Sequence, residues 1–304
     1  MSSSNWTAES IPNQSGKTFL ITGANSGLGL EAATILGSKG ATVVMAVRNM
    51  EKGKEAEAKI RSLYPKAKLD LMQLDLSDFD SIRNFSDKFH ARYNTLDVLM
   101  NNAGVMNPVK RELTKQGFEI QFGTNHLGHY LLTGLLLDLL KNTPGSRVVT
   151  QSSIMHKIKA DIHFDNLNWE KSFDTVKAYA QSKLSNLLFT YELDRLLKAN
   201  KVNVIATASH PGYTDTNLQN TSGLMVAIMN KVIAQSVDMG TLPILRAALE
   251  QNLAGAEYFG PTKMMETRGY PVKVESSPKS RDKELAKKLW AKTEELTGFK
   301  YSFV

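Results

Sequence analysis

The stretch Phe19-Leu-Ile-Thr-Gly-Ala-Asn-Ser-Gly-Leu-Gly-Leu30 begins as a short apolar run, turns through glycines and continues into a helical pattern. Its glycines, Gly23, Gly27 and Gly29, are spaced G-x-x-x-G-x-G. Glycine permits positive φ and, because it has no Cβ, lets a phosphate come close to the backbone. The N–H groups that open the next helix favour a bound pyrophosphate. The stretch therefore predicts the strand, phosphate loop and helix of a dinucleotide site, with a glycine-rich turn that binds nothing as the alternative.

Apolar runs and helical patterns alternate along the rest of the chain. The expected strands are 18–22, 42–47, 68–74, 96–101, 147–152, 202–208 and 256–260, and the expected helices are 28–38, 51–63, 77–92, 121–141, 176–200, 239–251 and 279–297. Such alternation predicts right-handed crossovers and a parallel sheet covered by helices on both faces. Because no repeat or Pro-rich linker divides the chain, we expect a single-domain, doubly wound α/β fold of Rossmann type over residues 1–304.

The composition excludes several classes of function. The 304 residues include no Cys, which excludes thiolate catalysis and Cys-ligated metals, and the six His show no metal spacing. The net charge is +7, yet Lys and Arg are scattered among Asp and Glu, which does not favour a nucleic-acid partner. We find no secretory signal and no apolar run long enough to cross a bilayer. We expect a cytoplasmic protein with no metal and no stable membrane insertion.

Arg48 follows the second expected strand, 19 residues after Gly29. An acidic residue about 20 residues after the glycines binds the ribose 2′-hydroxyl of NAD, whereas an Arg accommodates the 2′-phosphate of NADP. The guanidinium offers paired donors that match phosphate oxygens. Arg48 therefore favours NADP(H), with a solvated Arg at a strand end as the alternative.

Tyr179 and Lys183 are four residues apart on an expected helix and so share one face. A free Tyr titrates near pH 10, and a nearby ammonium lowers that pKa, which would make Tyr179 a usable proton donor or acceptor. Ser153 lies at a strand end on the same rim of the sheet, where it can bind a substrate oxygen or act only as a turn residue. Asn125 falls in a Leu-rich helix, where a buried amide needs partners.

Together these elements resemble the short-chain dehydrogenase/reductase family over nearly the whole chain. The matching segments are Thr22-Gly-Ala-Asn-Ser-Gly-Leu-Gly29, Asp75-Leu76, Asn101-Asn-Ala-Gly104, Asn125, Ser153, Tyr179-x-x-x-Lys183 and Pro211-Gly-Tyr-Thr-Asp-Thr216. Arg48-Asn49, Gln151-Ser-Ser153 followed by His156, and Asn166-Leu-Asn-Trp169 look like the retinol-dehydrogenase-like subgroup, which also resembles light-dependent protochlorophyllide reductases.

The resemblance implies a coenzyme site and a catalytic set. The implied coenzyme contacts are Gly23, Asn25, Ser26, Gly27, Leu28 and Gly29 at the pyrophosphate, Arg48 and Asn49 after the second strand, Asp75 and Leu76 at the adenine, Asn102, Ala103 and Gly104 at the adenosine ribose, and Pro211, Gly212, Thr214 and Thr216 at the nicotinamide carboxamide. Tyr179 is implied as the general acid or base and Lys183 as its partner on the nicotinamide ribose. Ser153 is implied to polarise the carbonyl, and Asn125 to hold a water that links Lys183 to solvent.

One spacing departs from the shorter, commoner family members. Ser153 and Tyr179 are 26 residues apart, about twice the usual separation. The same lengthening is seen in the retinol-dehydrogenase-like pattern, so we assign the carbonyl contact to Ser153 and keep Ser152 as the fallback.

The segment after Thr216 is expected to cover the substrate. Leu224, Met225 and further apolar residues up to 233 repeat at three- and four-residue steps. This predicts a lid over about 215–240, or equally a helix packed on the body or on a partner subunit. Tyr213 and His156 are expected to border the substrate, whereas the other histidines near the motifs are expected to be structural.

The tail 279–298 is predicted to be an amphipathic helix that ends at Gly298. Docking onto the body is the simpler interpretation, and attachment to a membrane surface is the alternative. From the whole sequence we expect an NADP(H)-dependent oxidoreductase that interconverts a carbonyl and an alcohol on a fairly apolar small molecule. A C=C reductase of the protochlorophyllide type and a non-catalytic NADP-sensing protein are the rivals. The subunit count, whether monomer, dimer or tetramer, stays open.

Overall fold

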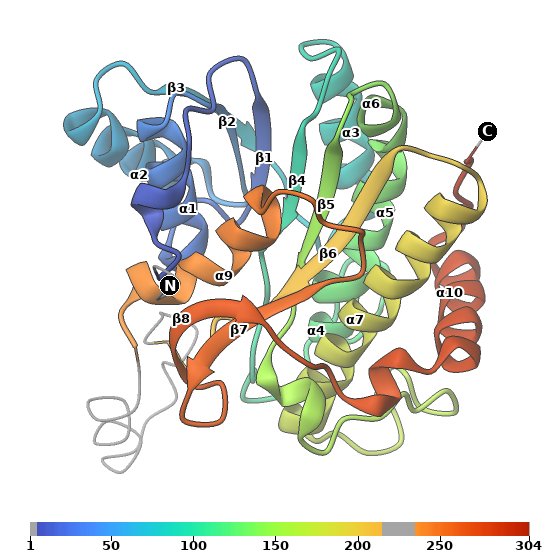
Figure 1. Cartoon of the computed structure of the whole chain (residues 1–304). Coiled ribbons are helices and arrows are strands. Elements are labelled where there is room, and N and C mark those ends of the chain that lie inside the picture. The colour runs from blue at the N-terminus through green and yellow to red at the C-terminus, as the bar shows by residue number, and fades with distance from the viewer. Residues whose placement is uncertain (1–4, 215–234, 304) are drawn as a thin grey trace.

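Eight strands form one central sheet in the computed structural model, which describes residues 5–214 and 235–303 (Figure 1). The strands are β1 (Thr18–Thr22), β2 (Thr42–Val47), β3 (Lys68–Gln73), β4 (Val98–Asn101), β5 (Ser146–Gln151), β6 (Val204–Ser209), β7 (Tyr258–Lys263) and β8 (Arg268–Lys273). Their order is β3-β2-β1-β4-β5-β6-β7-β8, and all neighbours are parallel except β7 and β8. The order reverses between β1 and β4, the point where ligands bind in open α/β sheets.

Helices cover both faces of the sheet, which confirms the predicted fold class. They are α1 (Gly27–Ser38), α2 (Met50–Leu63), α3 (Phe79–His90), α4 (Ile120–Phe122), α5 (His129–Leu135), α6 (Leu137–Lys141), α7 (Thr175–Ala199), α9 (Val237–Leu249) and α10 (Lys283–Thr297), with short 3₁₀ turns η1 (Ala8–Ser10), η3 (Ile154–Lys157) and η5 (Pro278–Arg281). Alternate strand residues face opposite layers, because successive side chains of a strand point to opposite sides. Phe19 and Ile21 of β1 pack with α1, α2 and α9, whereas Leu20 packs with α3, α5, α7 and α10.

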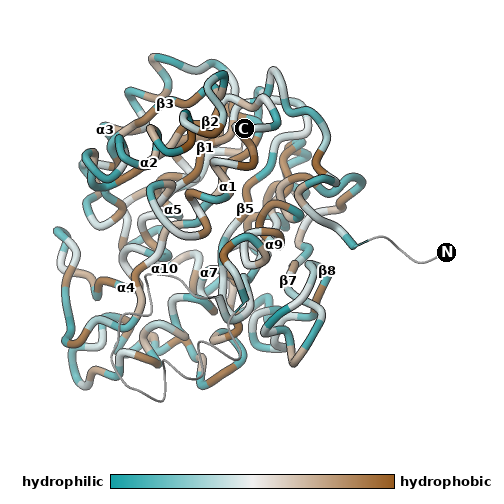
Figure 2. The backbone as a smooth tube through the Cα atoms, turned by 90° about the vertical axis from the view of Figure 1, so that its left-hand side faces the viewer, coloured by the Kyte–Doolittle hydropathy of each residue, from teal (hydrophilic) through white to brown (hydrophobic). Residues whose placement is uncertain are grey.

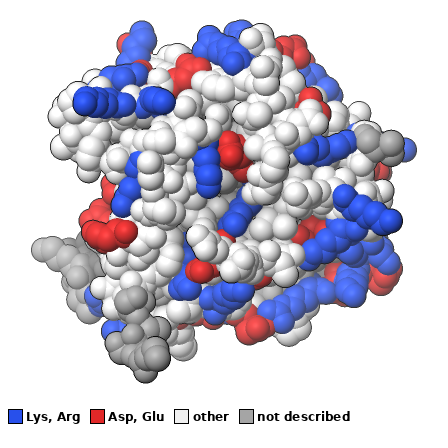
Figure 3. All heavy atoms as spheres, turned by 45° about the horizontal axis from the view of Figure 1, so that its top comes forward, with Lys and Arg blue, Asp and Glu red and all other residues white. Residues whose placement is uncertain are grey.

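Hydropathy follows this layering. In Figure 2 the strands are mostly brown and lie between helices whose outer turns are teal. On the face in Figure 3, basic and acidic side chains lie side by side and no continuous basic surface forms. Within residues 5–214 and 235–303, no helix combines the length and apolar character that a membrane span requires.

The helix expected over 121–141 is interrupted. A π-helical segment, Gly123–Gly128, separates α4 from α5, and Leu136 separates α5 from α6. The π-turns place Asn125 and Gly128 against neighbouring backbone: a Cβ on Gly128 would lie 2.4 Å from the carbonyl oxygen of Leu76. Single π-turns within α-helices are often found at functional sites.

The C-terminal half differs from expectation in one strand. The segment 256–260 was expected to be the last strand, but β8 follows it and pairs antiparallel with β7 at the sheet edge. The tail helix α10 ends at Gly298, which has φ +62°, as expected. It docks onto the body, because Leu289 and Trp290 belong to the main core and Trp290 stacks on Phe189 of α7.

Candidate active site

A cavity of about 550 Å³ opens where the β1–α1 turn, the ends of β4 and β5, and the loop after β6 converge. Its lining comes from the carboxyl ends of parallel strands at the point where the strand order reverses. Within the described part of the chain, no group of His, Asp and Glu could hold a metal ion.

The glycine turn forms one end of the cavity. Gly23 and Gly27 have φ of +69° and +51°, a conformation that other residues rarely adopt. A Cβ on Gly29 would lie 2.4 Å from the carbonyl oxygen of Gly23, so α1 can approach β1 only with glycine at this position. The turn and the start of α1 line the cavity with Asn25, Ser26 and Leu28, and the exposed Arg48, directly after β2, lines it as well. This is a cradle that side chains would fill.

Tyr179 and Lys183 face the cavity from α7, and Ser153 faces them from the end of β5. The Ser153 hydroxyl lies beside the Tyr179 phenol and favours its ionised form, and the Lys183 ammonium lies 5.6 Å from the centre of the Tyr179 ring. Lys183 donates to the carbonyl oxygen of Gln151 at 3.2 Å. The glycine turn lines the same cavity, so the expected phosphate loop and the expected catalytic residues lie in one site.

Asn125 is fully buried beneath this group. Its Oδ1 accepts from the backbone N–H of Val105 at 2.7 Å, and its Nδ2 donates to the Val105 carbonyl at 2.9 Å and to Ser182 at 3.0 Å. Gly104 lies between Asn125 and Lys183: a Cβ there would lie 3.3 Å from Asn125 Oδ1 and 3.5 Å from Lys183 Nζ. Asn125 therefore fixes the loop that forms the floor of the cavity.

A family model described as short chain dehydrogenase matches residues 17–226 of this chain. The chain belongs to the short-chain dehydrogenase family. It is 37% identical to human retinol dehydrogenase 13 over 93% of this chain and 85% of that protein. It is 38% identical to the chloroplastic short-chain dehydrogenase TIC 32 B of Brassica napus, over 90% of this chain and 86% of that one. It falls in the retinol-dehydrogenase-like subgroup that its motifs indicate.

Solved structures agree with this placement. A Mycobacterium paratuberculosis protein matches with a TM-score of 0.83 and 39% identity, over 98% of this chain and 100% of that one. A short-chain dehydrogenase from Burkholderia cenocepacia in complex with NADP matches with a TM-score of 0.65 over 81% of this chain and 96% of that one. At 22% identity the second match shows the fold alone. The family match and the retinol dehydrogenase relatives show an oxidoreductase, and the solved structures agree on its fold.

The pKa of Tyr179 differs from the expected direction. Burial raises it to about 12, and the adjacent Ser153 hydroxyl only partly offsets this. Burial also lowers the pKa of Lys183 to about 8. The pKa therefore does not fall below that of a free Tyr, because desolvation of the phenolate outweighs the contacts that favour it. In this short-chain dehydrogenase the phenol is protonated at neutral pH.

The two candidate serines have different environments. Ser152 is 2% exposed, and its hydroxyl donates to the backbone carbonyl of Lys183 at 2.9 Å. The Ser153 hydroxyl meets Tyr179 and accepts from the N–H of Met155 at 3.3 Å. The hydroxyl of Ser152 thus hydrogen-bonds to the backbone of α7, whereas that of Ser153 lies beside the phenol.

S153A is expected to lower kcat by about 10²-fold, the effect of losing one donor to a developing oxyanion, whereas S152A is expected to stay within severalfold of wild type. Steady-state reduction of a saturating aldehyde with NADPH measures both. A large loss in S152A with little loss in S153A would reverse the assignment.

Among the described residues, three of the expected coenzyme contacts do not line the cavity. Asn49 caps α2 by accepting from the N–H of Lys52, and Asp75 accepts from the hydroxyl of Ser77 at 2.6 Å. Leu76 is buried in the main core. Each has a local structural role, and a coenzyme role for them stays a prediction. Asn102, Ala103, Gly104, Pro211, Gly212, Tyr213 and Thr214 do line the cavity.

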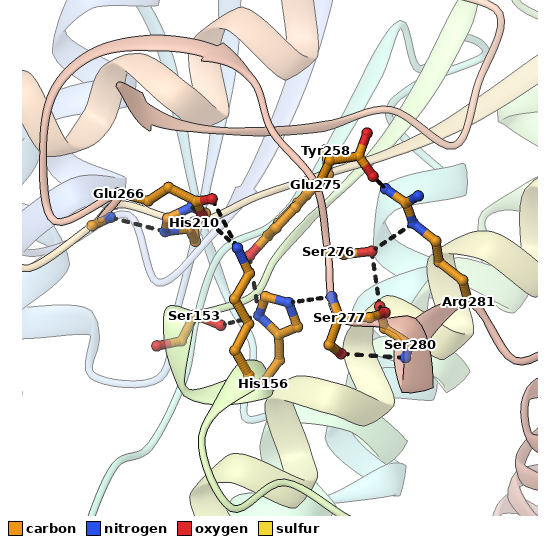
Figure 4. A network of polar contacts seen from close by, with 12 residues as sticks. Ser153, His156, His210, Tyr258, Glu266, Glu275, Ser276, Ser277, Ser280 and Arg281 are labelled. Atoms are coloured by element: carbon orange, nitrogen blue, oxygen red, sulfur yellow. Dashed lines mark hydrogen bonds and ion pairs between the residues drawn. The ribbon is translucent and has the colours of Figure 1, made fainter. Parts of the chain in front are cut away.

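His156 was expected to border the substrate but lies behind Ser153. Its Nδ1 lies 2.6 Å from the Ser153 carbonyl oxygen, and its Nε2 accepts from the N–H of Ser277 at 3.1 Å (Figure 4). Both nitrogens are used by a neutral ring, and burial lowers its pKa to about 4. His156 is thus not among the residues that line the cavity, although it orients the backbone of one that does.

The other histidines occupy structural positions. His126 contacts Thr293 of α10, and His129 lies between Thr22 and the Asn125 carbonyl. Sequence reasoning missed the cavity residues Val105, Met106 and Asn107, and Ile154 and Met155. The only sequence feature that points to these residues is their position directly after two recognised motifs. Thr216, Leu224, Met225 and most of the expected lid fall outside the described residues.

Proposed function

We propose that this protein is an NADP(H)-dependent oxidoreductase that interconverts a carbonyl and an alcohol on a fairly apolar small molecule. The observation that carries the proposal is that Tyr179, Ser153 and Lys183 line the same cavity as the glycine turn. A bound nicotinamide would supply or accept the hydride. The glycine cradle and Arg48 are the residues that would hold the coenzyme.

The protein's own groups would manage the proton. Ser153 and Tyr179 converge on one point, where both hydroxyls can donate to a carbonyl oxygen and polarise it. As negative charge develops on that oxygen, Tyr179 would transfer its proton, since the phenol is protonated at neutral pH. Lys183 would stabilise the resulting phenolate. In the oxidation of an alcohol the same groups would act in reverse.

The coenzyme preference rests on Arg48. R48A is expected to weaken NADPH binding by about tenfold to a hundredfold and to leave NADH binding unchanged, because only NADPH carries a 2′-phosphate for the guanidinium. Fluorescence titration with both coenzymes measures this, with K287A on α10 as a control that removes another exposed cation. If wild-type protein binds NADH at least as tightly as NADPH, the preference is wrong.

The relatives and the cavity support an apolar substrate. Retinol dehydrogenases are named for an apolar alcohol, and they match most of this chain. Met106, Ile154 and Met155 contribute apolar side chains to the cavity. A series of aldehydes and ketones of increasing chain length, assayed by NADPH absorbance, tests the proposal directly. No turnover across the series, together with tight NADPH binding, would favour the NADP-sensing alternative.

A C=C reductase of the protochlorophyllide type is the enzymatic alternative. Those reductases carry Cys near the pigment, and this chain has none. Assaying an α,β-unsaturated ketone and identifying which bond is reduced separates the two reactions. Reduction of the alkene alone would overturn the carbonyl assignment and leave the coenzyme site intact.

A further inference from the structure

The turn between β7 and β8 has an unusual backbone beside the cavity. Met264, Met265 and Glu266 have φ of +50°, +54° and +64° in succession. Side-chain-bearing residues rarely adopt this left-handed conformation, and it persists only where surrounding contacts hold it. This turn contacts the loop that follows β6.

The backbone after Glu266 packs against the loop that follows β6. The N–H of Tyr213 donates to the carbonyl oxygen of Thr267 at 2.8 Å. Gly212 has φ +68°, and a Cβ on it would lie 2.3 Å from the same oxygen. Gly212 and Tyr213 line the cavity. The turn therefore forms the outer support of this cavity wall.

Gln235 joins the same two segments from a third direction. Its side chain donates to the carbonyl of Pro211 at 2.6 Å and accepts from the N–H of Gly269 at 3.1 Å. Its backbone N–H donates to the carbonyl of Tyr213 at 2.9 Å. The wall is thus connected to β8 as well as to the turn.

Glu266 completes this support with its side chain. One carboxylate oxygen lies 2.8 Å and the other 2.9 Å from Lys157 Nζ, and the carboxylate lies 3.1 Å from Nε2 of the fully buried His210 (Figure 4). Burial opposes ionisation, but the contacts with His210 and Lys157 outweigh it and lower the pKa of Glu266 to about 2. The carboxylate is therefore charged at neutral pH.

These contacts join three segments that are distant in sequence. His210 directly precedes Pro211 and Gly212 of the wall, and its Nδ1 accepts from the N–H of Gly212 at 3.3 Å. Lys157 ends η3, the 3₁₀ turn that Ser153 caps. A single carboxylate thus lies between the turn, the wall formed by residues 211–214 and the segment that carries the catalytic serine.

We propose that Glu266 is a positioning residue that fixes the wall formed by residues 211–214, against which the nicotinamide half of the coenzyme binds. This rests on the proposed NADP(H)-dependent function. It predicts that loss of the Glu266 charge loosens binding of the nicotinamide half and spares binding of the adenine half, which the glycine turn and Arg48 would hold.

The test compares NADPH with 2′,5′-ADP, a ligand that has only the adenine half of the coenzyme. Both are titrated into wild type, E266Q and K157M by calorimetry, with thermal denaturation as a check on folding. E284Q is the control, since it removes a carboxylate that pairs with Lys287 at 2.7 Å on the exposed side of α10. If E266Q does not fold, K157M still tests the inference, because it removes the cation that contacts Glu266.

E266Q is expected to raise the Kd for NADPH about five- to tenfold and to leave the Kd for 2′,5′-ADP unchanged, with a smaller change in K157M and none in E284Q. Equal weakening of both ligands would indicate a general structural role and overturn the inference. Unchanged NADPH binding in both variants would also overturn it, while the proposed function would stand. If wild type binds neither ligand, the proposed coenzyme and the inference both fail.

Discussion

Y179F is expected to lower kcat by about 10²- to 10⁴-fold, the usual contribution of a general acid or base, while NADPH binding stays within twofold of wild type. The phenol is buried and meets Ser153, so Phe keeps the ring and its packing and removes only the proton donor. Because the pKa of Tyr179 is about 12, the donor form predominates at neutral pH, which suits carbonyl reduction. Steady-state kinetics at saturating NADPH and aldehyde measure kcat.

The control for Y179F is Y191F, on the same helix. Tyr191 also loses one phenol hydrogen bond on substitution, its 2.8 Å bond with Ser276, but it does not line the cavity. Its kcat is expected to stay close to that of wild type. If Y179F retained full kcat, the proton-donor role would be wrong and the NADP-sensing alternative would gain.

K183M is expected to lose activity and gain stability at neutral pH. Without the ammonium, kcat is expected to fall at least about 10²-fold, because the phenolate loses its stabilising charge. Met fills the same space, and the Gln151 carbonyl that Lys183 contacts still accepts from Asn186 at 3.0 Å. The substitution therefore leaves no buried acceptor without a partner.

The gain in stability depends on pH in a defined direction. Burial lowers the pKa of Lys183 from 10.5 to about 8, so the folded protein bears the full cost of the charged form below pH 8. Between pH 8 and 10.5 the folded protein releases a proton that the unfolded chain retains, and wild-type stability rises relative to K183M. K183M is expected to be more stable by on the order of 1–3 kcal/mol at pH 7, and this gain should shrink toward pH 10.

Urea unfolding of wild type and K183M at pH 7 and pH 9.5 measures the effect. K177M is the control, because Lys177 is exposed on the first turns of the same helix. A K183M protein that is less stable than wild type at pH 7 would show that Lys183 is not held in an unfavourable charged state. Residues of active sites often lower the stability of the folded protein in this way.

The fold was predictable wherever hydrophobic periodicity was strong. Helices cover both faces of the parallel sheet, so the apolar runs of its central strands are nearly continuous. The edge strand β8 was missed because Arg268-Gly-Tyr-Pro-Val-Lys273 contains Gly and Pro, which are typical of a loop. The π-helical segment could not be distinguished from an α-helix in the sequence, because its residues also suit an α-helix.

The site was predictable where motifs are local. The glycine turn, Tyr179 and Lys183 were identified from spacing and from family resemblance, and the structure brings them to one cavity. The direction of the Tyr179 pKa was not predictable, because it depends on how completely the fold excludes water. The contact between Glu266 and His210 joins residues far apart in the chain, and neither belongs to a recognisable motif.

The docking of α10 has a consequence for the order in which the protein folds. Leu289, Trp290 and Tyr301 complete the aromatic packing around Tyr130, and Phe299 and Tyr301 lie so close to Gly134 that a Cβ there would be within 2.7 Å of either ring. During synthesis this surface stays uncovered until the ribosome has released the segment that ends in these aromatic side chains. Nascent chains that stall before that point expose the outer faces of α5 and α7, and we expect chaperones to bind them there.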